Sequence, residues 1–127
     1  MSLFTLPGFF SCDAMNQMKT NQTNQTNRLS PEEIFARTIM AYGREGFEKL
    51  KGSYVAVVGL GGVGAAAAEA LVRGGVGRLR VIDCDVVKPT DINRQLLALA
   101  STVGRQKVDV AAERFLQINP SLRIEAL

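Results

Sequence analysis

Residues 54–64, YVAVVGLGGVG, decide the fold of this 127-residue chain, because they join an apolar run to a glycine-rich turn. The run at 54–58 is continuously β-prone, as expected for a parallel strand buried on both faces. Three glycines follow at once in a G-x-G-x-x-G pattern, and the alanine-rich residues 65–72 predict a helix that packs close to the sheet. A second strand is predicted at 79–83. Together these segments predict a β-turn-α-β unit.

Two short helices are predicted ahead of this unit. A helix is expected at 31–42, because Ser30 can cap it and Glu33 lies three residues after the cap. Gly43 is a plausible end to that helix, and a second helix is expected at 45–50.

The segments after the second strand extend the same architecture. A loop is predicted at 84–91, a short helix at 93–100, a longer helix at 102–118 and a third strand at 123–127. The fold class is therefore α/β, a Rossmann-like doubly wound parallel sheet. Because three parallel strands form only half of such a sheet, we expect residues 31–127 to be the truncated N-terminal part of a nucleotide-binding domain.

Residues 1–30 differ in composition from the rest, being rich in Asn, Gln and Thr, and are predicted to be disordered. The start of the chain lacks the cationic residues of a signal peptide, and no apolar run approaches the ~20 residues that cross a bilayer. We therefore expect a cytoplasmic protein without a membrane partner.

Composition excludes several kinds of chemistry. The chain has no histidine and only two cysteines, Cys12 and Cys84, so it holds no zinc finger, histidine-based triad or disulfide framework, and no metal ligand is predicted within it. The net charge is +3, with cations and carboxylates interleaved, so composition alone indicates no nucleic-acid-binding stripe.

The glycine turn predicts a bound nucleotide. Gly59 permits a sharp bend, Gly61 lets the backbone approach a phosphate, and Gly64 lets helix and strand come close. The helix N-terminus then offers free N–H groups to an anion. Asp83 ends the second strand, 19 residues after Gly64, where its carboxylate can accept hydrogen bonds from ribose hydroxyls.

Two cations beyond Asp83 favour nucleotidyl transfer over hydride transfer from NAD. If Arg94 and Lys107 face the glycine turn, they would clamp a triphosphate and stabilise the charge that develops at its α-phosphate. A fold that binds only a dinucleotide has no general need for such a group.

The order of these motifs resembles the ThiF/MoeB superfamily of adenylating enzymes, which are related to ubiquitin-activating enzymes. The motifs are G-x-G-G-x-G at 59–64, I-D-x-D at 82–85, N-R-Q at 93–95 and V-G-x-x-K at 103–107. Residues 35–127 carry the resemblance, which is nearest to the branch that dehydrates threonylcarbamoyladenosine in tRNA. In the family, a metal-binding aspartate and the substrate-recognising half lie beyond the part matched here.

The resemblance implies ATP and Mg²⁺ as cofactors, a homodimer, and a role for each matching residue. The implied nucleotide-binding residues are Gly59, Gly61, Gly62, Gly64, Asp83, Asp85, Asn93 and Gln95. The implied catalytic residues are Arg94 and Lys107, which contact phosphates, and Arg37, which reaches the ATP site of the partner subunit. By periodicity alone, Arg37 is a solvated residue on an amphipathic helix.

One position departs from the family pattern. Asp91 stands where the superfamily usually has an asparagine near the phosphates. Its carboxylate would repel ATP unless Mg²⁺ or Arg94 neutralises it.

Four functions are compatible with the sequence. The first is an ATP-dependent enzyme, or a fragment of one, that adenylates the threonylcarbamoyl carboxylate of a tRNA. The second has the same chemistry on a small ubiquitin-like sulfur carrier protein. The third is an inactive nucleotide-binding or dimerisation module, and the fourth, the least favoured, is an NAD-dependent oxidoreductase.

Overall fold

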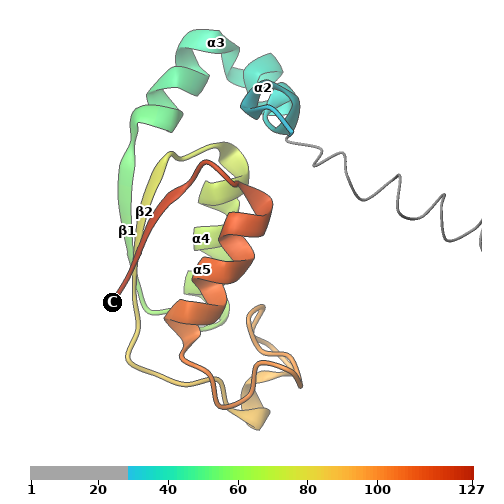
Figure 1. Ribbon diagram of the computed structural model, residues 1–127, viewed down its shortest axis with the longest axis vertical. Coiled ribbons are helices and arrows are strands. Elements are labelled where there is room, and N and C mark those ends of the chain that lie inside the picture. Colours follow the sequence, from blue (N-terminus) through green and yellow to red (C-terminus); the bar gives the residue numbers. More distant parts are fainter. Residues whose placement is uncertain (1–28) are drawn as a thin grey trace, which may run out of the picture.

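The computed structural model describes residues 29–127 (Figure 1). The disorder predicted for residues 1–30 therefore falls outside the described residues, except at Leu29 and Ser30. Within the described part of the chain, no helix combines the length and the apolar character that crossing a membrane requires.

A parallel sheet forms the centre of the fold. Its strands are β1 (Tyr54–Val58), β2 (Arg78–Ile82) and β3 (Arg123–Ala126), in the order β1-β2-β3. The sequence predicted these three strands to within one residue at each end. A continuous apolar run marks β1, and β-prone residues that follow Gly77 and Pro120 mark β2 and β3, in which charged residues alternate with apolar ones.

Helices α4 (Gly62–Gly74) and α5 (Lys107–Ile118) both cover one face of the sheet (Figure 1). Ala65 and Ala68 are fully buried, so α4 packs close to the strands. The expectation that 54–58 is buried on both faces is wrong for the described residues, because alternate residues of β1 are exposed. The connections from β1 to β2 and from β2 to β3 both step to the next strand in the same direction across the sheet. Because such crossovers are right-handed, both helices lie on the same face.

Helices α2 (Pro31–Ile34) and α3 (Ala36–Gly52) precede the sheet (Figure 1). The predicted cap is confirmed, because the Ser30 hydroxyl accepts a hydrogen bond from the Glu33 amide and the Glu33 carboxylate accepts one from the Ser30 amide. The helix expected at 31–42 breaks at Phe35, whose buried ring lies 5.3 Å from that of Phe47. Gly43, the predicted end, has φ +72 and produces a kink inside α3.

The segment between β2 and α5 differs most from the prediction. No α-helix forms at 93–100; a 3₁₀ turn, η1 (Pro89–Asp91), is followed by successive turns, and α5 begins at Lys107 rather than at Thr102. The buried Thr102 hydroxyl explains the difference, because it accepts a hydrogen bond from the Leu99 amide and donates one to the Leu97 carbonyl. These side-chain bonds replace the helical ones.

Candidate nucleotide-binding site

The carboxyl ends of β1 and β2 meet at one edge of the sheet, and the glycine turn begins there. The Gly59 amide donates a hydrogen bond to the Ile82 carbonyl at 2.8 Å, which holds the turn against β2. Gly59 has φ +85, a conformation that side chains disfavour. The chain therefore leaves β1 through a bend that needs glycine.

Gly64 lets the first turn of α4 lie directly on this bend. A Cβ atom at Gly64 would lie 1.8 Å from the Gly59 carbonyl oxygen, so no larger residue fits. Gly61 is the N-cap of α4 and supplies no side chain to cap the helix. The first N–H groups of α4 are therefore offered to a ligand rather than to a capping side chain.

Asp83 fixes the shape of the glycine turn. Its Oδ2 accepts a hydrogen bond from the Leu60 amide, and its Oδ1 accepts one from the Asp85 amide at 2.8 Å. A carboxylate has about four lone-pair positions, so both oxygens can still accept hydrogen bonds from ribose hydroxyls. The predicted ribose ligand is thus also the group that ties the turn to the end of β2.

The loop that carries Arg94 packs against the glycine turn. A Cβ atom at Gly62 would lie 3.3 Å from the Arg94 carbonyl oxygen. The Arg94 side chain is 60% exposed. Its Nη1 donates to the Thr90 carbonyl at 2.6 Å and to Asn93 Oδ1 at 3.2 Å. The structure therefore places the Arg94 backbone at the turn and its guanidinium on its own loop.

Asp91 holds this loop together and is buried. Its Oδ2 accepts a hydrogen bond from the Lys88 amide at 3.0 Å, and its Oδ1 accepts one from Gln95 Nε2 at 2.8 Å. Arg94 Nη2 lies 3.5 Å from the same Oδ1. Arg94 thus supplies the positive charge that was expected to keep this carboxylate from repelling ATP.

Lys107 reaches the site through Asp85. Its Nζ donates to Asp85 Oδ2 at 3.1 Å, and its backbone amide donates to the Asp85 carbonyl at 3.0 Å. The Lys107 side chain is 6% exposed, whereas that of Asp85 is 54% exposed. The hydrogen bond from Lys107, with the charges of Lys107 and Lys88, lowers the pKa of the Asp85 carboxyl. An ammonium has three donors, so Lys107 can hold Asp85 and a phosphate together.

The structure thus groups ten of the eleven predicted site residues at one edge of the sheet. Arg37 is the exception, because it lies on α3 at the opposite end of the sheet (Figure 1). Sequence reasoning missed the structural role of Asp91. The sequence does carry a signal for this role. Arg94 and Gln95 follow Asp91 by three and four residues, which is the spacing at which side chains meet on a helical turn.

The model of the ThiF family matches residues 35–127. The chain is 55% identical over 93 residues to a tRNA threonylcarbamoyladenosine dehydratase from Bacillus subtilis (strain 168), a match that covers 73% of this chain and 37% of the relative. It is 43% identical over 84 residues to a sulfur carrier protein adenylyltransferase from Thermus thermophilus, covering 66% of this chain and 31% of the relative.

A solved structure shows the same fold. The crystal structure of Escherichia coli tRNA N6-threonylcarbamoyladenosine dehydratase, TcdA, in complex with ATP matches with a TM-score of 0.74 and 43% identity, covering 76% of this chain and 40% of that one. The chain therefore spans well under half the length of these relatives. The family match covers most of the chain, and the glycine turn, Asp83 and the Arg94 loop occupy one edge as the resemblance implied, so this chain belongs to the ThiF family.

Proposed function

We propose that this chain is the ATP-binding part of an enzyme that adenylates the threonylcarbamoyl carboxylate of a tRNA. The observation that carries the proposal is the grouping at the carboxyl edge. Free amides of the glycine turn, the Asp83 carboxylate and the Lys107 ammonium lie on neighbouring segments linked by hydrogen bonds. The names of the dehydratase relatives support the choice of tRNA.

The proposed chemistry has two steps. A carboxylate oxygen of the substrate attacks the α-phosphorus of ATP, the bond from that phosphorus to the bridging oxygen breaks, and pyrophosphate leaves. A nitrogen of the threonylcarbamoyl group then attacks the activated carbonyl carbon and loses its proton, and AMP departs as the ring closes. The two steps together remove one water from the substrate.

The cations have separate tasks in this proposal. Lys107 is fixed by Asp85 and would donate to a phosphate oxygen with its remaining hydrogens. Arg94 would turn from the Thr90 carbonyl toward the phosphates, where a guanidinium can form two parallel hydrogen bonds. Asn93 and Gln95 would complete the polar wall through their amide groups.

We further propose a homodimer in which Arg37 acts in the site of the partner. Arg37 Nη1 contacts Met40 Sδ at 3.9 Å and lies within 4 Å of no carboxylate of residues 29–127. Its distance from the glycine turn means that only a second copy could bring it to ATP. The dimer is testable by sedimentation, and Arg37→Ala should lower turnover without lowering ATP affinity.

Magnesium is proposed to enter with ATP. Residues 29–127 hold no group of three acidic or thiol side chains suited to a metal ion, so we assign no magnesium ligand among them. Mg²⁺ commonly binds through substrate phosphates with only one or two carboxylates. We propose a cytoplasmic location, where ATP and tRNA are available.

A second candidate function is activation of a sulfur carrier protein. The likeness to the adenylyltransferase from Thermus thermophilus favours it, and the site would serve either carboxylate. ATP–pyrophosphate exchange separates the two candidates, because only the true acyl substrate stimulates it.

ATP binding by the chain, measured by calorimetry, tests the proposal. We expect Arg94→Ala and Lys107→Met each to weaken ATP binding by about tenfold, equivalent to 1.4 kcal/mol. Arg44→Ala is the control, because it removes an exposed cation from α3. Unchanged ATP affinity in both variants, or NAD binding that survives Arg94→Ala, would overturn the proposal.

A further inference from the structure

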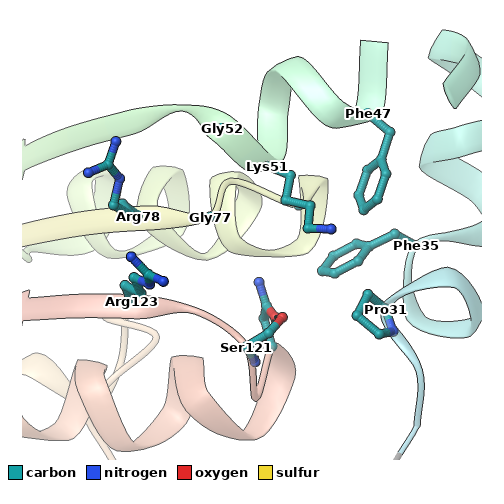
Figure 2. A pocket seen from close by; sticks show the side chains of 11 residues that line it. Pro31, Phe35, Phe47, Lys51, Gly52, Gly77, Arg78, Ser121 and Arg123 are labelled. Carbon is teal, nitrogen blue, oxygen red and sulfur yellow. Dashed lines mark hydrogen bonds between the residues drawn. The ribbon is translucent and has the colours of Figure 1, made fainter. Parts of the chain in front are cut away.

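A pocket lies at the opposite edge of the sheet, where β2 and β3 begin. Its volume is about 440 Å³, and Figure 2 shows Lys51 at the end of α3, Arg78 on β2 and Arg123 on β3 around the pocket. The nucleotide site lies beyond the carboxyl ends of the strands, so the length of β2 separates the two. At ~3.3 Å per residue, that separation is about 15 Å.

The lining of this pocket is strongly one-sided in charge. Lys51, Arg78 and Arg123 line it, and no carboxylate does. Among the described residues, neither arginine lies within 4 Å of a carboxylate oxygen, and the nearest acid to Lys51 is Glu48, at 3.9 Å. The pocket therefore presents three cations, and the described part of the chain leaves the two arginines among them without an acidic partner within 4 Å.

The register of the sheet places two of these cations side by side. Arg78 and Arg123 are direct partners in the parallel pairing of β2 with β3. The next pair on the same face is complementary, because Arg80 bonds to its partner Glu125. Like charges directly opposite each other destabilise a sheet. A bound anion would remove the repulsion between Arg78 and Arg123.

The floor of the pocket adds a neutral donor. Asn119 is 2% exposed, and its Oδ1 accepts hydrogen bonds from the Ser121 amide at 3.2 Å and the Ser121 hydroxyl at 2.8 Å. These bonds fix the side chain through its oxygen. None of the side-chain hydrogen bonds found within residues 29–127 uses its amide nitrogen, which can therefore donate to a ligand in the pocket.

We propose that this pocket binds a backbone phosphate of RNA. Guanidinium, ammonium and amide donors are the groups that contact phosphate oxygens in nucleic-acid complexes. The triphosphate at the carboxyl edge is too distant to reach the pocket, so the ligand must be a separate phosphate. An RNA chain carries many backbone phosphates, so it can place one of them in this pocket while another of its nucleotides reacts at the carboxyl edge. The choice of RNA rests on the proposed function.

Fluorescence anisotropy with labelled tRNA tests the site in the full chain. We expect the double variant Arg78→Gln, Arg123→Gln to bind tRNA about tenfold more weakly, with a salt slope smaller by about one. The matched control is Arg44→Gln, Lys49→Gln, which removes two charges from exposed positions of α3. Its tRNA affinity should stay within twofold of the wild type.

Equal tRNA affinity in the double variant and the control would overturn the proposal. Circular dichroism verifies the fold of each variant, and both arginines are exposed, so folding should be preserved. Inorganic phosphate at constant ionic strength should raise the melting temperature of the wild type more than that of the Arg78/Arg123 variant, because any phosphate binding at the glycine turn is common to both. A phosphate effect without a tRNA effect would overturn the assignment to RNA.

ATP calorimetry on the same proteins separates this proposal from the proposed function. ATP binding that is intact in the wild type and in both variants, with no specific tRNA effect, overturns the RNA site alone. A wild type that fails to bind ATP but shows the arginine-dependent tRNA affinity overturns the ATP-binding function and supports the RNA site.

Discussion

Replacing Gly64 by alanine should destabilise the fold more than any other change at the glycine turn. The new Cβ would lie 1.8 Å from the Gly59 carbonyl oxygen, whereas real Cβ atoms stay at least 3.0 Å from such neighbours, so the backbone must move by about 1.2 Å. Gly59 cannot yield easily, because its amide is bonded to Ile82 at 2.8 Å. We expect a loss of about 3 kcal/mol, which lowers the melting temperature by about 15 °C.

Gly74→Ala is the matched control. It makes the same chemical change in the same helix, but nothing lies within 4 Å of the added Cβ. Alanine is the better helix former, so this variant should be more stable than the wild type by about 0.5 kcal/mol. Urea unfolding followed by circular dichroism measures both variants. A Gly64→Ala protein within 1 kcal/mol of Gly74→Ala would refute the close-contact argument.

Three further predictions concern single residues. Glu69→Gln should cost about 1–2 kcal/mol at pH 7, because a hydrogen bond from Arg114 lowers the pKa of this buried carboxyl. A lowered pKa stabilises the fold above the ordinary value of 4.5, so the gap between variant and wild type in urea titrations should close as the pH falls below that value. Asp83→Asn should cost about 1–2 kcal/mol and weaken ATP binding in calorimetry, because one amide oxygen replaces two acceptors, so that either the Leu60 or the Asp85 amide loses its partner. Gly61→Ala should leave the melting temperature within about 3 °C, since its Cβ meets nothing within 4 Å, but should weaken ATP binding at least tenfold.

The regular elements of the fold could be predicted because their signals are local. An apolar run located β1, β-prone residues after Gly77 and Pro120 located β2 and β3, and the capping pattern at Ser30 located the start of α2. The break at Phe35 could not be predicted in this way. It depends on the Phe47 ring, which lies twelve residues further along the chain and packs against Phe35.

The segment 93–106 shows the same limit more clearly. Its local composition is compatible with a helix, but Gly104 has φ +86 and Val86 pairs with Gln106 in an antiparallel bridge. This bridge joins residues twenty positions apart, and sequence periodicity carries no information about it. The bridge is also what brings Lys107 to Asp85, so the part of the loop that could not be predicted positions a predicted site residue.

The two carboxylate oxygens of Asp91 accept hydrogen bonds from different partners, and this arrangement explains the role of the residue. Asp91 departs from the family pattern and was expected to repel ATP unless Mg²⁺ or Arg94 neutralised it; in the structure its Oδ2 accepts a hydrogen bond from the Lys88 amide and its Oδ1 accepts one from Gln95. The contact to Arg94, at 3.5 Å, is the longest of the three and the most exposed. Arg94 can therefore leave Asp91 for a phosphate while the two remaining bonds keep the loop folded. Under the proposed function, this arrangement would let the Arg94 guanidinium move to a phosphate without unfolding the loop.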